Sequence, residues 1–311
     1  MKPFRKNVAI AIDGGGIRGT IVARALSILE DHLGKPCHEF CRLTTGTSTG
    51  AIISAGIARG LTASRMHELY ERLADVVFPK TLRSFFWPLT RYRYSLDPLK
   101  AALTDALGGG VLGDVWAADP PTDVVITLFD LVTKHTGFAK PWKPEYANWS
   151  LVDTVLASCS VPTYFPPVHG RYVDGGVGSY ANPSYLAAYE ARFYLDWDPN
   201  ETTLLSFGTG RYPQVLQPGQ ASRLWPWQWL EPILGAFQQS ADDQQIHLVN
   251  TFFPNLDFRR FQVEMREPIG MDGTSRIPEL TAYGDELGHK VLNDETDTPI
   301  EVAFVKPARR P

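Results

Sequence analysis

The chain begins with a short apolar run, a cluster of glycines and a segment with helical periodicity. Residues 8–12 are all apolar, which is typical of a strand buried on both faces. The glycine cluster covers residues 13–19, and behind it apolar residues recur at helical spacing as far as Gly34. Because glycine readily ends a helix, this pattern predicts a strand, a tight loop and a helix.

The same order of elements follows directly a second time. Residues 40–45 predict a short strand, small residues form a turn at 46–50, and an Ala- and Ile-rich segment over 51–59 predicts a helix. Two such units in succession indicate an α/β protein.

The rest of the chain continues this alternation, with no internal repeat and no obvious linker. We expect mainly helix over 61–108, helices over 150–160 and 278–292, and strands over 123–132, 171–173, 203–207 and 258–263. Residues 224–238 are rich in Trp, Pro and Leu, and we assign them no element. We predict one domain over residues 1–255, with residues 256–311 as a C-terminal extension packed on it.

The charge balance is close to neutral. The 311 residues include 30 Lys and Arg against 34 Asp and Glu, a net charge of −4, and 44% are apolar. This composition disfavours a nucleic acid polymer as the partner, because phosphate binding needs clustered positive charge. No apolar stretch approaches the ~20 residues that cross a bilayer, so we expect a cytoplasmic protein whose membrane contact is peripheral.

Three cysteines, Cys37, Cys41 and Cys159, are too few for a disulfide framework. Cys37 and Cys41 have the spacing of half a zinc site, but no second Cys or His pair with ligand spacing accompanies them. Buried thiols are the favoured interpretation, and we expect neither a metal nor another cofactor.

The first motif with chemical meaning is Gly46-x-Ser48-x-Gly50, between a predicted strand and a predicted helix. A serine on such a sharp turn has its hydroxyl exposed, and the flanking glycines let the backbones approach each other. The N-terminus of the following helix favours the negative charge that forms during attack. Alone the pattern is weak, since an ordinary turn of small residues looks the same.

A second motif, Gly14-x-Gly16-x-x-Gly19, follows the first strand and has two interpretations. A dinucleotide-binding fingerprint would need an acid at the end of a second strand about 20 residues later, and the acids at that distance fall late in the helix. In an oxyanion hole, consecutive glycine amides would donate to one developing negative charge, with Arg18 as a nearby cation. A plain tight turn has the same residues.

A third motif, Asp174-Gly175-Gly176, ends a predicted short strand. A carboxylate there is able to accept a proton from a serine hydroxyl, although a strand-end aspartate is more often a simple turn former. None of the seven histidines lies in a recognisable base motif. However, His247 and His289 follow Asp174, and either would complete the Ser…Asp…His order of an α/β-hydrolase triad.

Together the three motifs resemble the patatin-like phospholipase family. The resemblance covers about residues 7–210, and it rests on residues 13–19, 46–50, 157–167, 174–176, 182–183 and 205–210. One departure is Ala51, where many members carry a third glycine after the turn.

The resemblance implies a three-layer α/β/α sandwich with a mainly parallel central sheet, residues 1–255 being the catalytic domain. It implies a lipid acyl hydrolase of phospholipase A, lysophospholipase or acylglycerol lipase type that works through a Ser–Asp dyad and an acyl-enzyme. Ser48 would be the nucleophile and Asp174 the base. Amides around Gly15 and Gly16 would hold the oxyanion, assisted by Arg18, and no metal is required.

The resemblance also implies partners. A phospholipid or membrane surface would be the substrate. Some bacterial members are antiviral effectors activated by a cyclic dinucleotide, and residues 225–292 are similar to that branch. A homo-oligomer is left open. The alternatives are an esterase with a Ser-His-Asp triad and a storage or nucleotide-binding protein without relevant turnover.

Two aromatic segments are candidates for contact with lipid, because Trp favours the membrane interface. They are Phe85–Trp87 with Leu89, and Trp225, Trp227 and Trp229 with Leu230. Arg83, Arg91 and Arg93 are placed to meet anionic headgroups. Aromatic residues more often fill the core, which is the favoured interpretation here.

Overall fold

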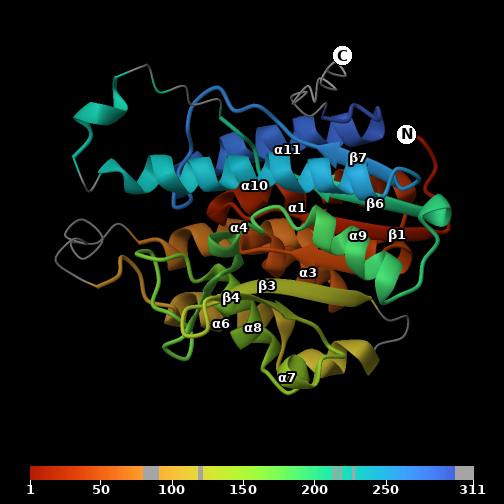
Figure 1. Cartoon of the computed structure of the whole chain (residues 1–311), viewed down its shortest axis with the longest axis horizontal. Helices are drawn as coiled ribbons and strands as arrows, with labels where there is room; N and C mark the ends of the chain where they lie inside the picture. Colours follow the sequence, from red (N-terminus) through yellow and green to blue (C-terminus); the bar gives the residue numbers. More distant parts are fainter. Residues whose placement is uncertain (80–90, 118–121, 213–215, 217–218, 226–227, 298–311) are drawn as a thin grey trace, which may run out of the picture.

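The computed structural model of the chain describes residues 1–79, 91–117, 122–212, 216, 219–225 and 228–297. Within these residues, seven strands form one sheet in the order β4-β3-β2-β1-β6-β7, with β5 beside β3 (Figure 1). Pairings from β3 through β2, β1 and β6 to β7 are parallel, and β4 and β5 run antiparallel to β3. The strands are β1 (Asn7–Ile12), β2 (Leu43–Gly46), β3 (Asp123–Asp130), β4 (His135–Ala139), β5 (Tyr172–Asp174), β6 (Thr202–Phe207) and β7 (Asp257–Phe261).

Helices cover both faces of this sheet and complete three layers. The larger layer contains α1 (Gly19–Leu33), α3 (Thr49–Ala58), α4 (Ala63–Val77), α6 (Asp97–Leu107), α8 (Leu151–Cys159) and α11 (Ile277–Leu292). The other face is covered by α9 (Ser184–Phe193) and α10 (Leu230–Phe252), which lie in front in Figure 1. Short helices α2 (Cys37–Phe40) and α7 (Pro144–Ala147) connect these elements. The predicted α/β/α sandwich with a mainly parallel sheet is confirmed.

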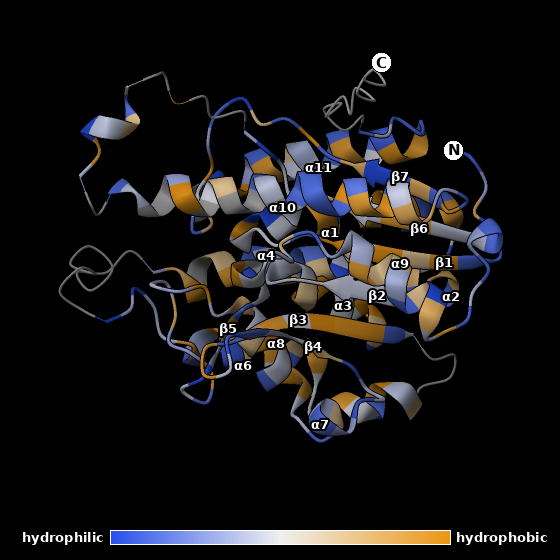
Figure 2. Ribbon diagram, viewed as in Figure 1, coloured by the Kyte–Doolittle hydropathy of each residue, from blue (hydrophilic) through white to orange (hydrophobic). Residues whose placement is uncertain are grey.

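Alternation along β1 explains why the sheet has a core on each side. Ile10 and Ile12 point into the larger core, whereas Ala9 and Ala11 belong to the second core, beside α9. Successive side chains of a strand point to opposite faces, and the small alanines allow α9 to pack closely. All four residues are buried, as the continuous apolar run predicts. Figure 2 shows that β3 is likewise hydrophobic along most of its length.

The last part of the chain contributes directly to the sheet. β7 pairs in parallel with β6, and the residues behind it return to the glycine loop, where the Ile17 amide donates to the Met271 carbonyl at 2.9 Å. The predicted strand over 258–263 and helix over 278–292 correspond to β7 and α11. Residues 256–297 therefore pack against the elements of the first 210 residues.

Some elements differ from the sequence-based expectation. α10 is a helix of 23 residues where no element was assigned, and β4 and α9 were not predicted either. Trp225 and Trp229 are exposed, at 63% and 38% of their surface, so the expectation that they fill the core is wrong. Phe85–Trp87, Leu89, Arg83 and Trp227 lie outside the described residues. None of the described helices combines the length and the apolar character that a membrane span requires.

Candidate active site

Ser48 occupies a sharp turn between β2 and α3. Its backbone has φ 56° and ψ −121°, a strained conformation that projects the side chain out of the turn. The turn is possible because two glycines allow close backbone contacts. A Cβ atom on Gly46 would lie 2.1 Å from the Gly50 carbonyl oxygen, and one on Gly50 would lie 2.1 Å from the Ile12 carbonyl oxygen. The predicted strand–turn–helix geometry is present.

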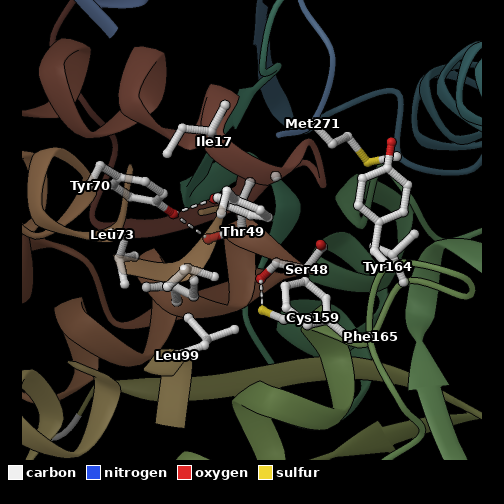
Figure 3. A pocket seen from close by; sticks show the side chains of 15 residues that line it. Ile17, Ser48, Thr49, Tyr70, Leu73, Leu99, Cys159, Tyr164, Phe165 and Met271 are labelled. Carbon is white, nitrogen blue, oxygen red and sulfur yellow. Dashed lines mark hydrogen bonds between the residues drawn. The ribbon is translucent and has the colours of Figure 1, made fainter. Parts of the chain in front are cut away.

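Helix α8 packs against this turn and is hydrogen-bonded to the backbone of Ser48. The Ser48 amide donates to the Ser158 hydroxyl at 2.8 Å. The Cys159 thiol donates to the Ser48 carbonyl oxygen at 3.2 Å (Figure 3). Both contacts are buried, which fixes the serine backbone on the side away from solvent. Both residues lie in segment 157–167 of the family resemblance, but their contacts with Ser48 are not evident from the sequence.

Asp174 ends β5 and lies next to the serine. Its carboxylate accepts a hydrogen bond from the Gly176 amide at 2.7 Å, and the Ser48 hydroxyl lies close enough to lower the pKa of the acid. The residue is only 6% exposed, and its own amide donates to the Ser160 carbonyl oxygen at 3.1 Å. Burial raises the pKa of Asp174 to about 6, although the Ser48 hydroxyl and the Gly176 amide both lower it. The structure thus brings together the predicted nucleophile and the predicted base.

The two histidines of the triad alternative lie elsewhere. His247 is exposed on α10 and is hydrogen-bonded to Thr251 of the same helix, at 3.4 Å. His289 is exposed near the end of α11. Burial, the Ser48 hydroxyl and the Gly176 amide determine the pKa of Asp174, and no imidazole contributes to it.

The glycine loop after β1 supplies hydrogen-bond donors at the same end of the sheet. The Gly14 amide donates to the Ala181 carbonyl oxygen at 2.9 Å, so it is occupied. Across the described part of the chain, the amides of Gly15 and Gly16 have no acceptor. A Cβ atom on Gly14 would lie 3.3 Å from the Ser48 Cβ, so the loop lies directly beside the nucleophile. This arrangement fits the predicted oxyanion hole.

Arg18 braces this loop. Its guanidinium donates to the carbonyl oxygens of Gly15 and Gly210, each at 3.2 Å. Burial lowers the pKa of Arg18, and the charge of Asp13 opposes that effect. Direct help from Arg18 to the oxyanion stays a prediction.

The remaining motif glycines permit close packing around the site. A Cβ atom on Gly19 would lie 2.1 Å from the Thr49 hydroxyl oxygen, where α1 meets α3. One on Gly175 would lie 2.2 Å from the Thr127 hydroxyl oxygen of β3. Neither position has room for a side chain.

An apolar pocket opens beside Ser48. Its empty volume is about 490 Å³ including the mouth. Side chains from α3, α4, α6, α8 and neighbouring loops, including the segment between β7 and α11, line it, among them Tyr70, Leu73, Leu99, Phe165 and Met271 (Figure 3). The Tyr70 hydroxyl donates to the Thr49 carbonyl oxygen at 3.0 Å, so the polar end of this ring is satisfied within the protein. Met271 was not predicted as a site residue, because it lies about 220 residues beyond Ser48.

The cysteines and acids do not form a metal centre in the described residues, where no group of three or more His, Cys, Asp or Glu is arranged to hold an ion. Cys37 and Cys41 are fully buried thiols, and the Cys41 thiol donates to the Leu43 carbonyl oxygen at 3.0 Å.

Comparison with known proteins identifies several relatives of this chain. A 27% identical relative is the cGAMP-activated phospholipase of Vibrio cholerae, matched over 76% of this chain and 74% of its own. Patatin-1-Kuras 2 of Solanum tuberosum is 24% identical over 94% of this chain and 86% of its own. An intracellular phospholipase A2 of Caenorhabditis elegans is 28% identical over 67% of this chain, which spans only 20% of that protein.

Among solved structures, VipD from Legionella pneumophila aligns with a TM-score of 0.47 and 11% identity, over 94% of this chain and 67% of its own. The model of the family described as patatin-like phospholipase matches residues 10–187, more than half of the chain. This match includes the glycine loop, Ser48 and Asp174. The chain belongs to the patatin-like phospholipase family.

Proposed function

We propose that the protein is a lipid acyl hydrolase of phospholipase A type, which cleaves fatty-acyl esters through Ser48 and Asp174. The observation that carries this proposal is the position of Ser48 beside the buried carboxylate of Asp174, where the serine hydroxyl lowers the pKa of the acid. The two unoccupied amides and the apolar pocket beside Ser48 support it. Names of relatives in three kingdoms of life refer to phospholipases or patatins, which agrees with a lipid ester as substrate.

The reaction runs in two acyl transfers. In the first, Asp174 takes the Ser48 proton while the serine oxygen attacks the ester carbonyl carbon. The amides of Gly15 and Gly16 donate to the oxyanion, each being worth roughly 3–4 kcal/mol in the transition state. The ester C–O bond then breaks, and the leaving alcohol receives the proton from Asp174. In the second transfer, water gives a proton to Asp174 and attacks the acyl-enzyme, and Ser48 regains its proton as the fatty acid leaves.

The environment of Asp174 suits this role. A carboxylate is a weak base when exposed, but burial raises the pKa of Asp174 to about 6 and so brings it closer to the working pH. The acid is still ionised at neutral pH, which a base requires. No imidazole is needed for either proton transfer.

Regulation and membrane contact extend the same proposal. The Vibrio cholerae relative is named for activation by cGAMP, and it aligns over three quarters of each chain. We carry over activation by a cyclic dinucleotide as the regulated form of this activity, with peripheral membrane contact during turnover. The exposed Trp225 and Trp229 are suitable for that contact, because indole rings favour the interface between water and lipid.

The first prediction concerns the dyad. Wild type, Ser48→Ala and Asp174→Asn are incubated with vesicles of mixed phospholipids, with and without cGAMP, and released fatty acids and lysolipids are measured by mass spectrometry. We expect each substitution to reduce release by at least about 10³-fold, because the chemical step loses its nucleophile or its base. The products also show which ester bond is broken.

Matched controls make this result specific. Asp196→Asn changes an aspartate whose side chain is 93% exposed, and Ser64→Ala changes an exposed serine on α4, so both should keep wild-type release. His247→Ala and His289→Ala should also keep it. Full release by Ser48→Ala, or loss in either histidine variant comparable with that of Ser48→Ala, would contradict the dyad.

The second prediction concerns pH. Because only the ionised form of Asp174 accepts the serine proton, kcat/KM for a neutral ester should fall as pH drops through about 6, by about tenfold per unit below it. Above pH 7 this carboxyl contributes no further change. A p-nitrophenyl butyrate assay across pH 4.5–8 tests this, and a rate that stays flat down to pH 4.5 would contradict Asp174 as the base.

The third prediction concerns the pocket. Leu73 and Leu99 are buried in its wall, so replacing either with Phe fills space that an acyl chain would need. We expect the ratio of activity on long-chain to short-chain p-nitrophenyl esters to fall about tenfold, since each methylene in an apolar pocket is worth 1–3 kcal/mol. Leu131→Phe, at a residue that is 46% exposed, is the control. An unchanged ratio in both pocket variants would place the acyl chain elsewhere.

A further inference from the structure

A single buried arginine joins three elements behind the active site. Arg260 of β7 has a side chain only 2% exposed, and its guanidinium donates to both carboxylate oxygens of Asp13, at the end of β1. It also donates to the Ser206 hydroxyl of β6 at 2.9 Å and to the Asp242 carboxylate of α10 at 2.8 Å. Four hydrogen bonds from one planar group set the positions of all three partners tightly.

Asp13, one partner of Arg260, stands at the start of the glycine loop, residues 13–19, which we call the oxyanion loop. Asp13 lies two residues before Gly15, the first of the two glycines whose amides are unoccupied, and its own amide donates to the Phe207 carbonyl oxygen at 3.0 Å. The Asp13 backbone is thereby fixed to β6 while its side chain is fixed to β7. The direction of the next amides depends on this residue, because it is the last one tied to the sheet before the loop.

Asp242, another partner of Arg260, contacts residues 174–182, the segment that carries the base, Asp174. Asp242 accepts a second hydrogen bond, from the Asn182 side-chain amide at 2.6 Å. Asn182 is the last residue of the segment that begins at Asp174. The carbonyl oxygen of the neighbouring Ala181 accepts a hydrogen bond from the Gly14 amide at 2.9 Å. The base segment and the oxyanion loop are thus joined directly, and joined again through Asp242 and Arg260.

We propose that Arg260 and Asp242 are positioning residues of the hydrolase, which keep the glycine amides and the Asp174 segment in register. Helix α10 is then part of the catalytic apparatus, although it supplies no group to the reacting atoms. Gln245, one turn after Asp242, also donates to the segment, at the Ser179 carbonyl oxygen, 3.3 Å away. This proposal rests on the proposed function of Ser48 and Asp174.

The two ways of changing Asp242 separate geometry from charge. Asp242→Asn keeps an oxygen that accepts from Asn182 and Arg260 but removes the negative charge. Asp242→Ala removes the connection itself. If the residue acts by position, the alanine variant should lose activity and the asparagine variant should keep most of it. Asp243→Asn changes the next residue of α10, which is exposed, and serves as the matched control.

The experiment measures turnover per intact active site. Each variant is labelled to completion with a fluorophosphonate probe that reacts at Ser48, and kcat and KM are measured with p-nitrophenyl butyrate. For Asp242→Ala we expect kcat per labelled site to fall about tenfold with KM changed less than about twofold, because misplaced donors weaken the transition state. Asp242→Asn should stay within about threefold of wild type, and Asp243→Asn should equal it.

Other outcomes would overturn the inference. A merely structural role would lower the labelled fraction or the melting temperature of Asp242→Ala but leave turnover per labelled site unchanged. If Asp242→Ala does not fold, Arg260→Lys decides, because it keeps the charge but cannot reach all its partners at once: wild-type turnover per site there overturns the proposal. Ser48→Ala separates this inference from the proposed function, since wild-type activity in that variant would contradict the proposed function itself.

Discussion

Burial of the Asp174 carboxylate is the constraint on which the site depends. Removing a carboxylate from water is costly unless hydrogen bonds replace the lost hydration. Here the Gly176 amide donates to the carboxylate at 2.7 Å, and the nearby Ser48 hydroxyl also favours the ionised form. The serine is therefore a structural partner of the acid as well as the proposed nucleophile. The same burial brings the pKa of Asp174 near neutrality, where a base is most useful.

The sheet explains why these groups meet. The glycine loop follows β1 and Ser48 follows β2, and because these strands are adjacent and parallel, their carboxyl ends lie at one edge. Asp174 arrives differently, at the end of β5, which pairs antiparallel with β3 over only three residues. Such a short strand does not fix the position of its own end. The hydrogen bond from Asp174 to the Ser160 carbonyl oxygen and the one from Asn182 to Asp242 hold the segment in place instead.

The motifs and the buried strands could be predicted because they depend on local chemistry. Glycines at 46 and 50 are required by close backbone contacts, within the turn for Gly46 and with the end of β1 for Gly50. The apolar run at 8–12 reflects burial on both faces of the strand. Helix α10 could not be predicted in the same way. Its buried positions 242, 245, 246 and 249 have helical spacing, but the first two are polar, so an apolar periodicity does not reveal them. Arg260 in a strand likewise resembles a solvent-exposed residue until its partners, up to 247 positions away, are known.

The charges around the oxyanion loop also form a balanced set. Asp13 and Asp242 stand against Arg260, and Arg18 acts on Asp13 from the other side of the loop. Two carboxylates and two guanidiniums cancel formally, so these four groups place no net charge beside the glycine amides. Burial raises the pKa of Asp13 to about 7, and Arg260 opposes that rise. Because burial favours the neutral form of Asp13, its ionised form depends on Arg260, and that dependence ties the orientation of the loop to β7 and α10.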